Sequence, residues 1–266
     1  MNNKVCNRFP RFLYKFMPIN KYTISNLLNN QLWFASPISY NDPFDCSFFI
    51  KSGYDSNYAE KIESNFVNLG IYQDGEIKSY IPNFKKIFKE NPDGFGEFLN
   101  EEMHKLLSTL GISCFCDNKK NTLLWAHYAD SHKGICLKFD TKKDMILFNP
   151  EHNNSDCIAI SRVNYKSNYS KIPTYREIAD KILYVVPFTK SKEWSYENEI
   201  RMLSKKTGAL KFNKSTLIEI SFGCNCSEMD LNDIYMLVQN TNYPNVVFKK
   251  AIKSKTNFCF DFIDVK

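Results

Sequence analysis

The segment KEWSYENEIRM, residues 192 to 202, places two glutamates one residue apart and follows them with an arginine. Side chains at alternate positions of a strand share a face, so a strand here would put Glu197, Glu199 and Arg201 on one side. A face with two like charges costs free energy to bury and is ordinary when it is solvated. The segment is therefore either an exposed strand face or the acidic centre of a site.

The composition predicts a packed globular chain. Its 266 residues are 43% hydrophobic and 15% aromatic, which fits one large or two small domains and argues against disorder. The net charge of +6 permits an anionic partner such as a nucleotide or nucleic acid without requiring one. No apolar run approaches the ~18 residues of a membrane helix, and the first residues lack the apolar core of a signal peptide. We therefore expect a cytoplasmic protein with reduced thiols and no membrane partner.

The nine cysteines include two Cys-x-Cys pairs, Cys114/Cys116 and Cys224/Cys226. Structural zinc sites generally use Cys-x-x-Cys or wider spacings, so we expect no metal site. In the apolar stretch ISCFC, the alternation instead places Cys114 and Cys116 on one face of a buried strand.

The apolar patterns predict a mixed order of strands and helices. Strands are expected over residues 12–18, 31–36, 111–117, 133–140, 161–166 and 217–223, with a closing hairpin over 245–264. Helices are expected over residues 21–30, 121–132, 175–187 and 227–241, the first capped by Asn20 and the last by Ser227 with Asp230. The order indicates an α+β fold with a mixed or split sheet and flanking helices. We expect a single domain over residues 1–266, with a helical insertion at about 55–110.

Four polar and aromatic clusters are candidates for chemistry. They are LYKFMP with Tyr14 and Lys15, WFASPISYNDPFD with Ser36, Asn41, Asp42 and Asp45, LLWAHYADSHKG with Trp125, His127, Tyr128 and His132, and the glutamate segment. Each of these clusters can also be explained by a purely structural role. Trp125 and Tyr128 lie at helical spacing and fit a face packed on the core. The Asn and Asp side chains of the second cluster fit a turn in which they bond their own backbone.

Taken in order, these segments resemble a known family. LYKFMPIN, LWFASPISYNDPFD, LLWAHYADSHKGICLKFD, KEWSYENEIRM and IEISFGCNCSEMD resemble the bacterial domain-of-unknown-function family 2971 (DUF2971), over roughly residues 12–262. This resemblance implies a bacterial setting of phage defence or toxin action, and it supplies no activity.

A more remote resemblance suggests an activity. A basic residue on the first strand, a helix, an aromatic middle and a late Glu-x-Glu are similar in order to the ADP-ribosyltransferase fold. The resemblance implies that Lys15 anchors a dinucleotide at the position where the fold has Arg or His. It also implies that Tyr128 or Ser36 shapes the nicotinamide pocket and that Glu199 holds the nicotinamide ribose.

Further roles follow from the same resemblance. Glu197 would position or deprotonate an acceptor, with His127 as another catalytic participant. Tyr14 would contact the dinucleotide, and Arg201 could grip its pyrophosphate with two parallel hydrogen bonds.

The expected function is NAD-dependent ADP-ribosyl transfer, or NAD glycohydrolysis, with NAD as the substrate. Breaking the nicotinamide–ribose bond builds positive charge on the sugar, which a nearby carboxylate stabilises. The acceptor would be water, a protein or a nucleic acid. Two alternatives stay open. One is a non-catalytic nucleotide- or nucleic-acid-binding defence effector, and the other is a metal-dependent nuclease that uses Asp42 and Asp45.

Overall fold

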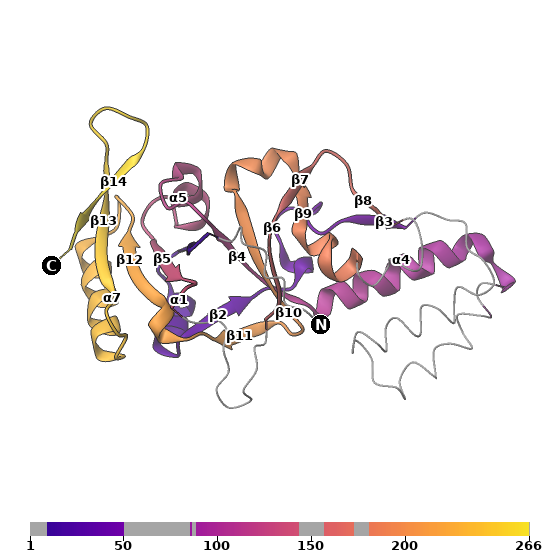
Figure 1. The fold of residues 1–266 in the computed structure, drawn as a ribbon, viewed down its shortest axis with the longest axis horizontal. Helices are drawn as coiled ribbons and strands as arrows, with labels where there is room; N and C mark the ends of the chain where they lie inside the picture. Colours follow the sequence, from indigo (N-terminus) through magenta and orange to yellow (C-terminus); the bar gives the residue numbers. More distant parts are fainter. Residues whose placement is uncertain (1–9, 51–85, 87–88, 144–156, 173–180, 266) are drawn as a thin grey trace. The chain divides into compact units, whose positions relative to one another are not determined.

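The computed structural model describes residues 10–50, 86, 89–143, 157–172 and 181–265 (Figure 1). The chain divides into two compact units. The first unit comprises Met1–Phe34, Ser113–Arg162 and Ser195–Lys266, and the second comprises Ala35–Ile112 and Val163–Trp194. Most of the predicted helical insertion lies outside the described residues, as does the first half of the helix predicted over 175–187. The described end of the insertion belongs to the second unit.

The first unit is built on a mixed sheet, which in the described residues has eight strands in the order β14-β13-β12-β5-β1-β4-β10-β6. In chain order, its strands are β1 (Phe12–Met17), β4 (Gly111–Cys116), β5 (Ile135–Asp140), β6 (Cys157–Arg162), β10 (Glu199–Ser204), β12 (Leu217–Phe222), β13 (Val247–Lys253) and β14 (Phe260–Asp264). β12 and β13 run parallel, whereas β5 is antiparallel to both β1 and β12. The predicted α+β class, mixed sheet and closing hairpin of β13 and β14 are confirmed.

Two capped helices pack on this sheet. The Asn20 side chain accepts two backbone N–H bonds in the first turn of α1 (Lys21–Leu28). At α7 (Glu228–Asn240), Ser227 Oγ accepts from the Asp230 backbone and donates to the Asp230 carboxylate. Both predicted caps are confirmed, because an N-cap oxygen satisfies N–H groups that have no partner inside the helix.

One face of the sheet, together with α1 and α7, forms the main hydrophobic core. Its members include Leu13, Met17, Leu137, Phe139, Ile200, Met202, Ile220 and Phe222 from the strands, Leu27 from α1, and Ile234 and Val238 from α7. In Figure 1, α7 runs alongside β12 and β13. The two-stranded pair of β2 (Gln31–Phe34) and β11 (Gly208–Lys211) adds Leu32, Phe34 and Leu210 to this core.

The opposite face of the sheet carries polar side chains. Lys138 pairs across the strands with both Tyr14 and Glu219, and Tyr14 also pairs with Cys116. Residues paired in neighbouring strands project to the same side. We call this side the polar face, and its members are Tyr14, Cys114, Cys116, Lys138, Glu199, Arg201, Glu219 and Ser221.

Helix α5 (Thr122–Tyr128) lies against β1 on this side, where Trp125 packs edge-on against Phe16 with ring centroids 5.0 Å apart. Trp125 is fully buried, so the core explanation holds for this residue.

A left-handed turn connects α5 to β5. Asp130, Ser131 and His132 have φ values of 44°, 52° and 69°. Gly134 follows, and a Cβ atom there would lie 2.2 Å from the Met17 carbonyl oxygen. The glycine is therefore required for the close approach of two backbones. Much of the motif HYADSHKG has a structural role, because it reverses the chain between helix and strand.

The second unit contains two short parallel strand pairs and several helices. β3 (Phe48–Ile50) pairs with β8 (Ser170–Ile172), and β7 (Asn164–Lys166) pairs with β9 (Thr189–Ser191). The helical segments are α4 (Pro92–Thr109), η1 (Pro37–Ser39) and η2 (Val186–Phe188), and α4 contacts both η1 and β3. Among the described helices, none is long and apolar enough to cross a membrane.

Candidate functional site

The glutamate segment is not a single strand. A 3-10 helix, η3 (Lys192–Glu197), ends at Glu197, and β10 begins at Glu199. Between them Asn198 has a φ of 46°, a left-handed conformation that asparagine tolerates. The expectation that both glutamates share a strand face with Arg201 is therefore wrong for Glu197. It holds for Glu199 and Arg201, which are two residues apart in β10.

All three charged side chains are buried, with exposed fractions of 3% for Glu197, 5% for Glu199 and 0% for Arg201. The explanation as a solvated strand face is therefore wrong. Arg201 Nε donates to Glu199 Oε1 at 2.8 Å, and Arg201 Nη2 donates to Glu199 Oε2 at 3.1 Å. This bidentate pair fixes the direction of the carboxylate and compensates its buried charge.

Glu197 accepts a hydrogen bond from a tyrosine. The half-buried Tyr128 hydroxyl donates to Glu197 Oε1 at 2.6 Å. Burial and the bond to Glu197 raise the pKa of Tyr128, so the phenol stays protonated and acts as a donor. His127 is exposed beside this pair, with its ring centroid 6.2 Å from that of Tyr196. Asn121 joins the two segments, since its side chain donates to the Tyr196 carbonyl at 2.6 Å.

Cys114 connects this group to the polar face of the sheet. Burial, followed by the charge of Glu199, raises the pKa of its thiol to about 12. The pKa of Cys116 is also raised to about 12, chiefly by burial. Both thiols therefore stay protonated at neutral pH. We call the group formed by Cys114, Tyr128, Glu197, Glu199 and Arg201 the carboxylate cluster.

Lys15 contacts the backbone of Cys114, a member of the carboxylate cluster, but its side chain lies on the other side of the sheet. Along β1 it alternates with the polar-face residues and shares the core side with Leu13 and Met17. Its Nζ donates to Ser113 Oγ at 3.0 Å and to the Cys114 carbonyl oxygen at 3.1 Å. Burial lowers the pKa of Lys15. Glu199 projects to the opposite side, because its neighbour Ile200 lies in the core.

Of the other two expected dinucleotide contacts, Tyr14 shares the polar face with Glu199, whereas Ser36 does not. Tyr14 lies on the polar face, where burial followed by the charge of Glu219 raises its pKa to about 12. Ser36 belongs to the second unit, and its hydroxyl donates to the Ser108 carbonyl in the last turn of α4 at 2.7 Å. The carboxylate cluster therefore unites Tyr128, Glu197, Glu199 and Arg201 of the predicted site, with His127 beside it.

The NDPFD motif forms a turn in the second unit. Asp42 Oδ1 accepts from the Phe44 backbone N–H at 2.9 Å, as expected for an aspartate that bonds its own turn. Within the described chain, the other oxygen of Asp42 has no hydrogen-bond partner. Asp45 Oδ2 lies 3.8 Å from Lys190 Nζ in a buried ion pair. The described residues contain no group of three His, Cys, Asp or Glu side chains placed to hold a metal ion.

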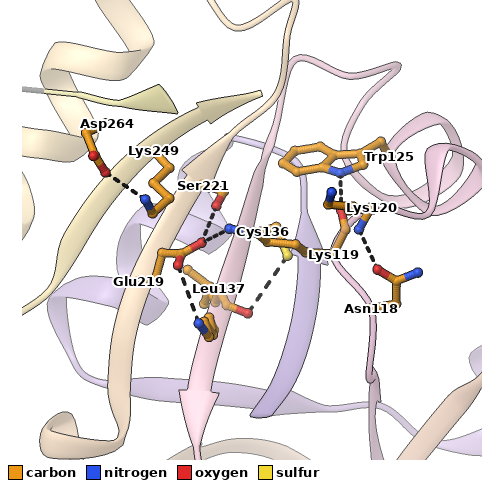
Figure 2. Close-up of polar contacts among 11 residues, drawn as sticks. Asn118, Lys119, Lys120, Trp125, Cys136, Leu137, Glu219, Ser221, Lys249 and Asp264 are labelled. Carbon is orange, nitrogen blue, oxygen red and sulfur yellow. Dashed lines mark hydrogen bonds and ion pairs between the residues drawn. The ribbon is translucent and has the colours of Figure 1, made fainter. Parts of the chain in front are cut away.

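A second buried carboxylate on the polar face was not predicted. Figure 2 shows that Ser221 Oγ, at 2.7 Å, and Lys119 Nζ both donate to Oε1 of Glu219. Lys138 Nζ lies 3.6 Å from the other oxygen. Burial alone would raise the pKa of Glu219, but the bonds from Lys119 and Ser221 hold it below its ordinary value. The sequence does contain a signal for this pair of charges, since Glu219 is the one acid in the apolar strand LIEISF and Lys138 the one lysine in ICLKFD.

Comparison with known proteins gives one family match. No curated protein and no solved structure matches the chain. The resemblance to ADP-ribosyltransferases therefore stays a prediction. The resemblance to DUF2971 is confirmed from α5 to the carboxylate cluster: residues 124–202 match the model of that family, which is described as "Protein of unknown function (DUF2971)".

Proposed function

We propose that the first unit binds NAD and cleaves its nicotinamide–ribose bond, passing ADP-ribose to water or to a macromolecular acceptor. The observation that carries the proposal is the geometry of the carboxylate cluster. Glu197 and Glu199 are buried one residue apart, and each is held by a directional donor, Tyr128 at 2.6 Å and Arg201 at 2.8 and 3.1 Å. Fixed carboxylates in a water-poor site are suited to stabilising a developing cation.

The reaction needs one stabilising carboxylate and one proton acceptor. As the glycosidic bond breaks, nicotinamide leaves with the bonding electron pair and becomes neutral, while positive charge develops at the ribose. Glu199, oriented by Arg201, faces that charge. The oxygen of water or of the acceptor then bonds to the sugar carbon, and its proton passes to Glu197. Tyr128 holds Glu197 in position.

Binding of the pyrophosphate requires a cation on the same face. Lys15 lies on the core side of β1, so we do not assign this role to it. Arg201 already bonds both oxygens of Glu199. We assign the pyrophosphate to Lys138, which lies on the polar face opposite Tyr14. Its Nζ is 3.6 Å from one oxygen of Glu219, and about a fifth of its side chain is exposed.

A second candidate is nucleotide binding without cleavage. The observation in its favour is that Arg201 satisfies both oxygens of Glu199, as a purely structural ion pair also would. In the defence setting implied by the family resemblance, such a protein would sense a nucleotide rather than consume it.

The test is nicotinamide release from NAD by the purified chain, with and without cell extract as a source of acceptor. Glu199→Gln keeps the shape of the side chain and removes its charge. Glu193→Gln is the matched control, because Glu193 is an exposed glutamate of the same segment. We expect release by the wild type and the control, and a rate lower by about 10²–10³ in Glu199→Gln. NAD binding without release would favour the sensor, and no binding would contradict both candidates.

A further inference from the structure

A pocket of about 290 Å³ lies within the second unit. It forms where the start of the β3–β8 pair meets the end of the β7–β9 pair. Ser47 immediately precedes β3, and Lys166 is the register partner of Ser191 at the end of β9. A hydrogen bond of 3.3 Å from Ser170 Oγ to Thr189 Oγ1 ties the two strand pairs together. The pocket is therefore held by paired strands, although its rim is formed by turns.

The lining carries two ammonium groups, one of which is paired with the Asp45 carboxylate. It contains two lysines, Lys166 and Lys190, several hydroxyl groups and one amide, and none of its nine residues is acidic. Lys190 is buried and held in place, because its Nζ lies 3.8 Å from Asp45 Oδ2 and 4.7 Å from the centroid of the Trp194 ring. Lys166 is exposed at the rim. A fixed ammonium, a mobile ammonium and hydroxyl donors suit a phosphate group.

One wall of the pocket is aromatic. Phe44 comes from the NDPFD turn and Tyr169 from the turn before β8, and their ring centroids are 6.4 Å apart with a tilt of 32°. Both rings contact each other and remain about half exposed, with 57% of Phe44 and 49% of Tyr169 accessible. Two exposed aromatic side chains beside a cationic pocket provide a surface on which a flat ring can stack.

The geometry points to a binding site in the second unit for a nucleoside monophosphate, with the phosphate at Lys166 and Lys190 and the base against Phe44 and Tyr169. The volume is at the lower limit of small-molecule sites, which suits one nucleotide and excludes a dinucleotide. This inference does not depend on NAD chemistry at the carboxylate cluster, because every lining residue belongs to the second unit.

The test is calorimetric titration of the full chain with AMP, GMP, CMP and UMP, beside adenosine and inorganic phosphate. We expect at least one monophosphate to bind more tightly than either adenosine or phosphate, since each of those lacks half of the contacts. Tyr169→Ala should weaken that binding about fivefold or more. Lys166→Ala should weaken it roughly two- to fivefold. Lys192→Ala, an exposed lysine of the same unit outside the pocket, should leave it unchanged.

The variants separate this pocket from the carboxylate cluster. Tyr169 lies in an exposed turn and Lys166 is the exposed last residue of β7, so their replacement leaves the core of the unit in place. Nucleotide binding that survives both changes but is lost in Glu199→Gln would locate the ligand in the first unit and overturn the inference. Failure of all four monophosphates to bind would also overturn it. Equal binding of phosphate alone would refute the role of the aromatic wall.

Discussion

Replacing Arg201 with methionine tests whether the glutamate segment is buried as described. The change removes two charged hydrogen bonds, of 2.8 and 3.1 Å, and leaves the Glu199 carboxylate without its arginine partner at 5% exposure. Breaking a buried pair by removing one partner typically costs about 3–5 kcal/mol of the free energy of unfolding. For a chain of this size, that corresponds to a fall in Tm of roughly 10 °C.

The assay is equilibrium unfolding in urea for the wild type, Arg201→Met, Glu199→Gln and the double variant. Each single change strands one partner of the pair, whereas the double change removes both charges. We therefore expect the double variant to lose less stability than the sum of the single variants, with a coupling of about 1–3 kcal/mol. A solvated ion pair would behave differently: Arg201→Met would cost less than about 1 kcal/mol of the free energy of unfolding, and the two changes would show no coupling. That result would contradict the burial of the Glu199–Arg201 pair.

Three further predictions concern the sheet. Gly134→Ala should lower the free energy of unfolding by about 3 kcal/mol, because its Cβ would lie 2.2 Å from the Met17 carbonyl; urea unfolding checks this. Glu219→Gln should destabilise the protein at pH 7 by roughly 1.5–3 kcal/mol. The pKa of Glu219 in the folded state lies below its ordinary value of 4.5. The stabilisation that its charge provides is therefore fully present above pH 4.5 and is lost as the pH falls through the folded-state pKa. The difference in free energy of unfolding between the wild type and Glu219→Gln should accordingly be smaller at pH 3 than at pH 7. Lys15→Met should leave the free energy of unfolding unchanged or raise it, because burial on the core side lowers the pKa of this lysine and so disfavours its charge. The rate of nicotinamide release should stay unchanged. Loss of activity in a folded variant would contradict the placement of Lys15 outside the site.

Local signals predicted the elements of the fold well. The caps at Asn20 and Ser227 depend only on residues within one turn of the helix start, and both form. The two-residue period of a strand likewise placed Cys114 and Cys116 on one face, which the register of β1 with β4 and the contact of Cys114 with Glu199 bear out. Interactions between near neighbours decide such features, so the sequence displays them directly.

The arrangement of the site depended on information that the sequence does not display. In FLYKFM both alternating sets, one with Lys15 and one with Tyr14, contain large apolar residues, so the pattern does not decide which set faces the core. A single left-handed residue, Asn198, separates Glu197 from the strand that begins at Glu199. The contact of Glu219 with Lys119 joins residues 100 positions apart, and only the strand order brings them together.

We propose that the carboxylate cluster cleaves NAD. The most direct measurement is the rate of nicotinamide release by Glu199→Gln relative to Glu193→Gln, with the folded fraction of both variants fixed by their thermal unfolding curves. We expect a ratio of about 10⁻² to 10⁻³, because in the proposed mechanism Glu199, and not Glu193, faces the developing charge of the ribose. Equal rates in the two folded variants would contradict it, and would leave the Glu199–Arg201 pair with a structural role alone.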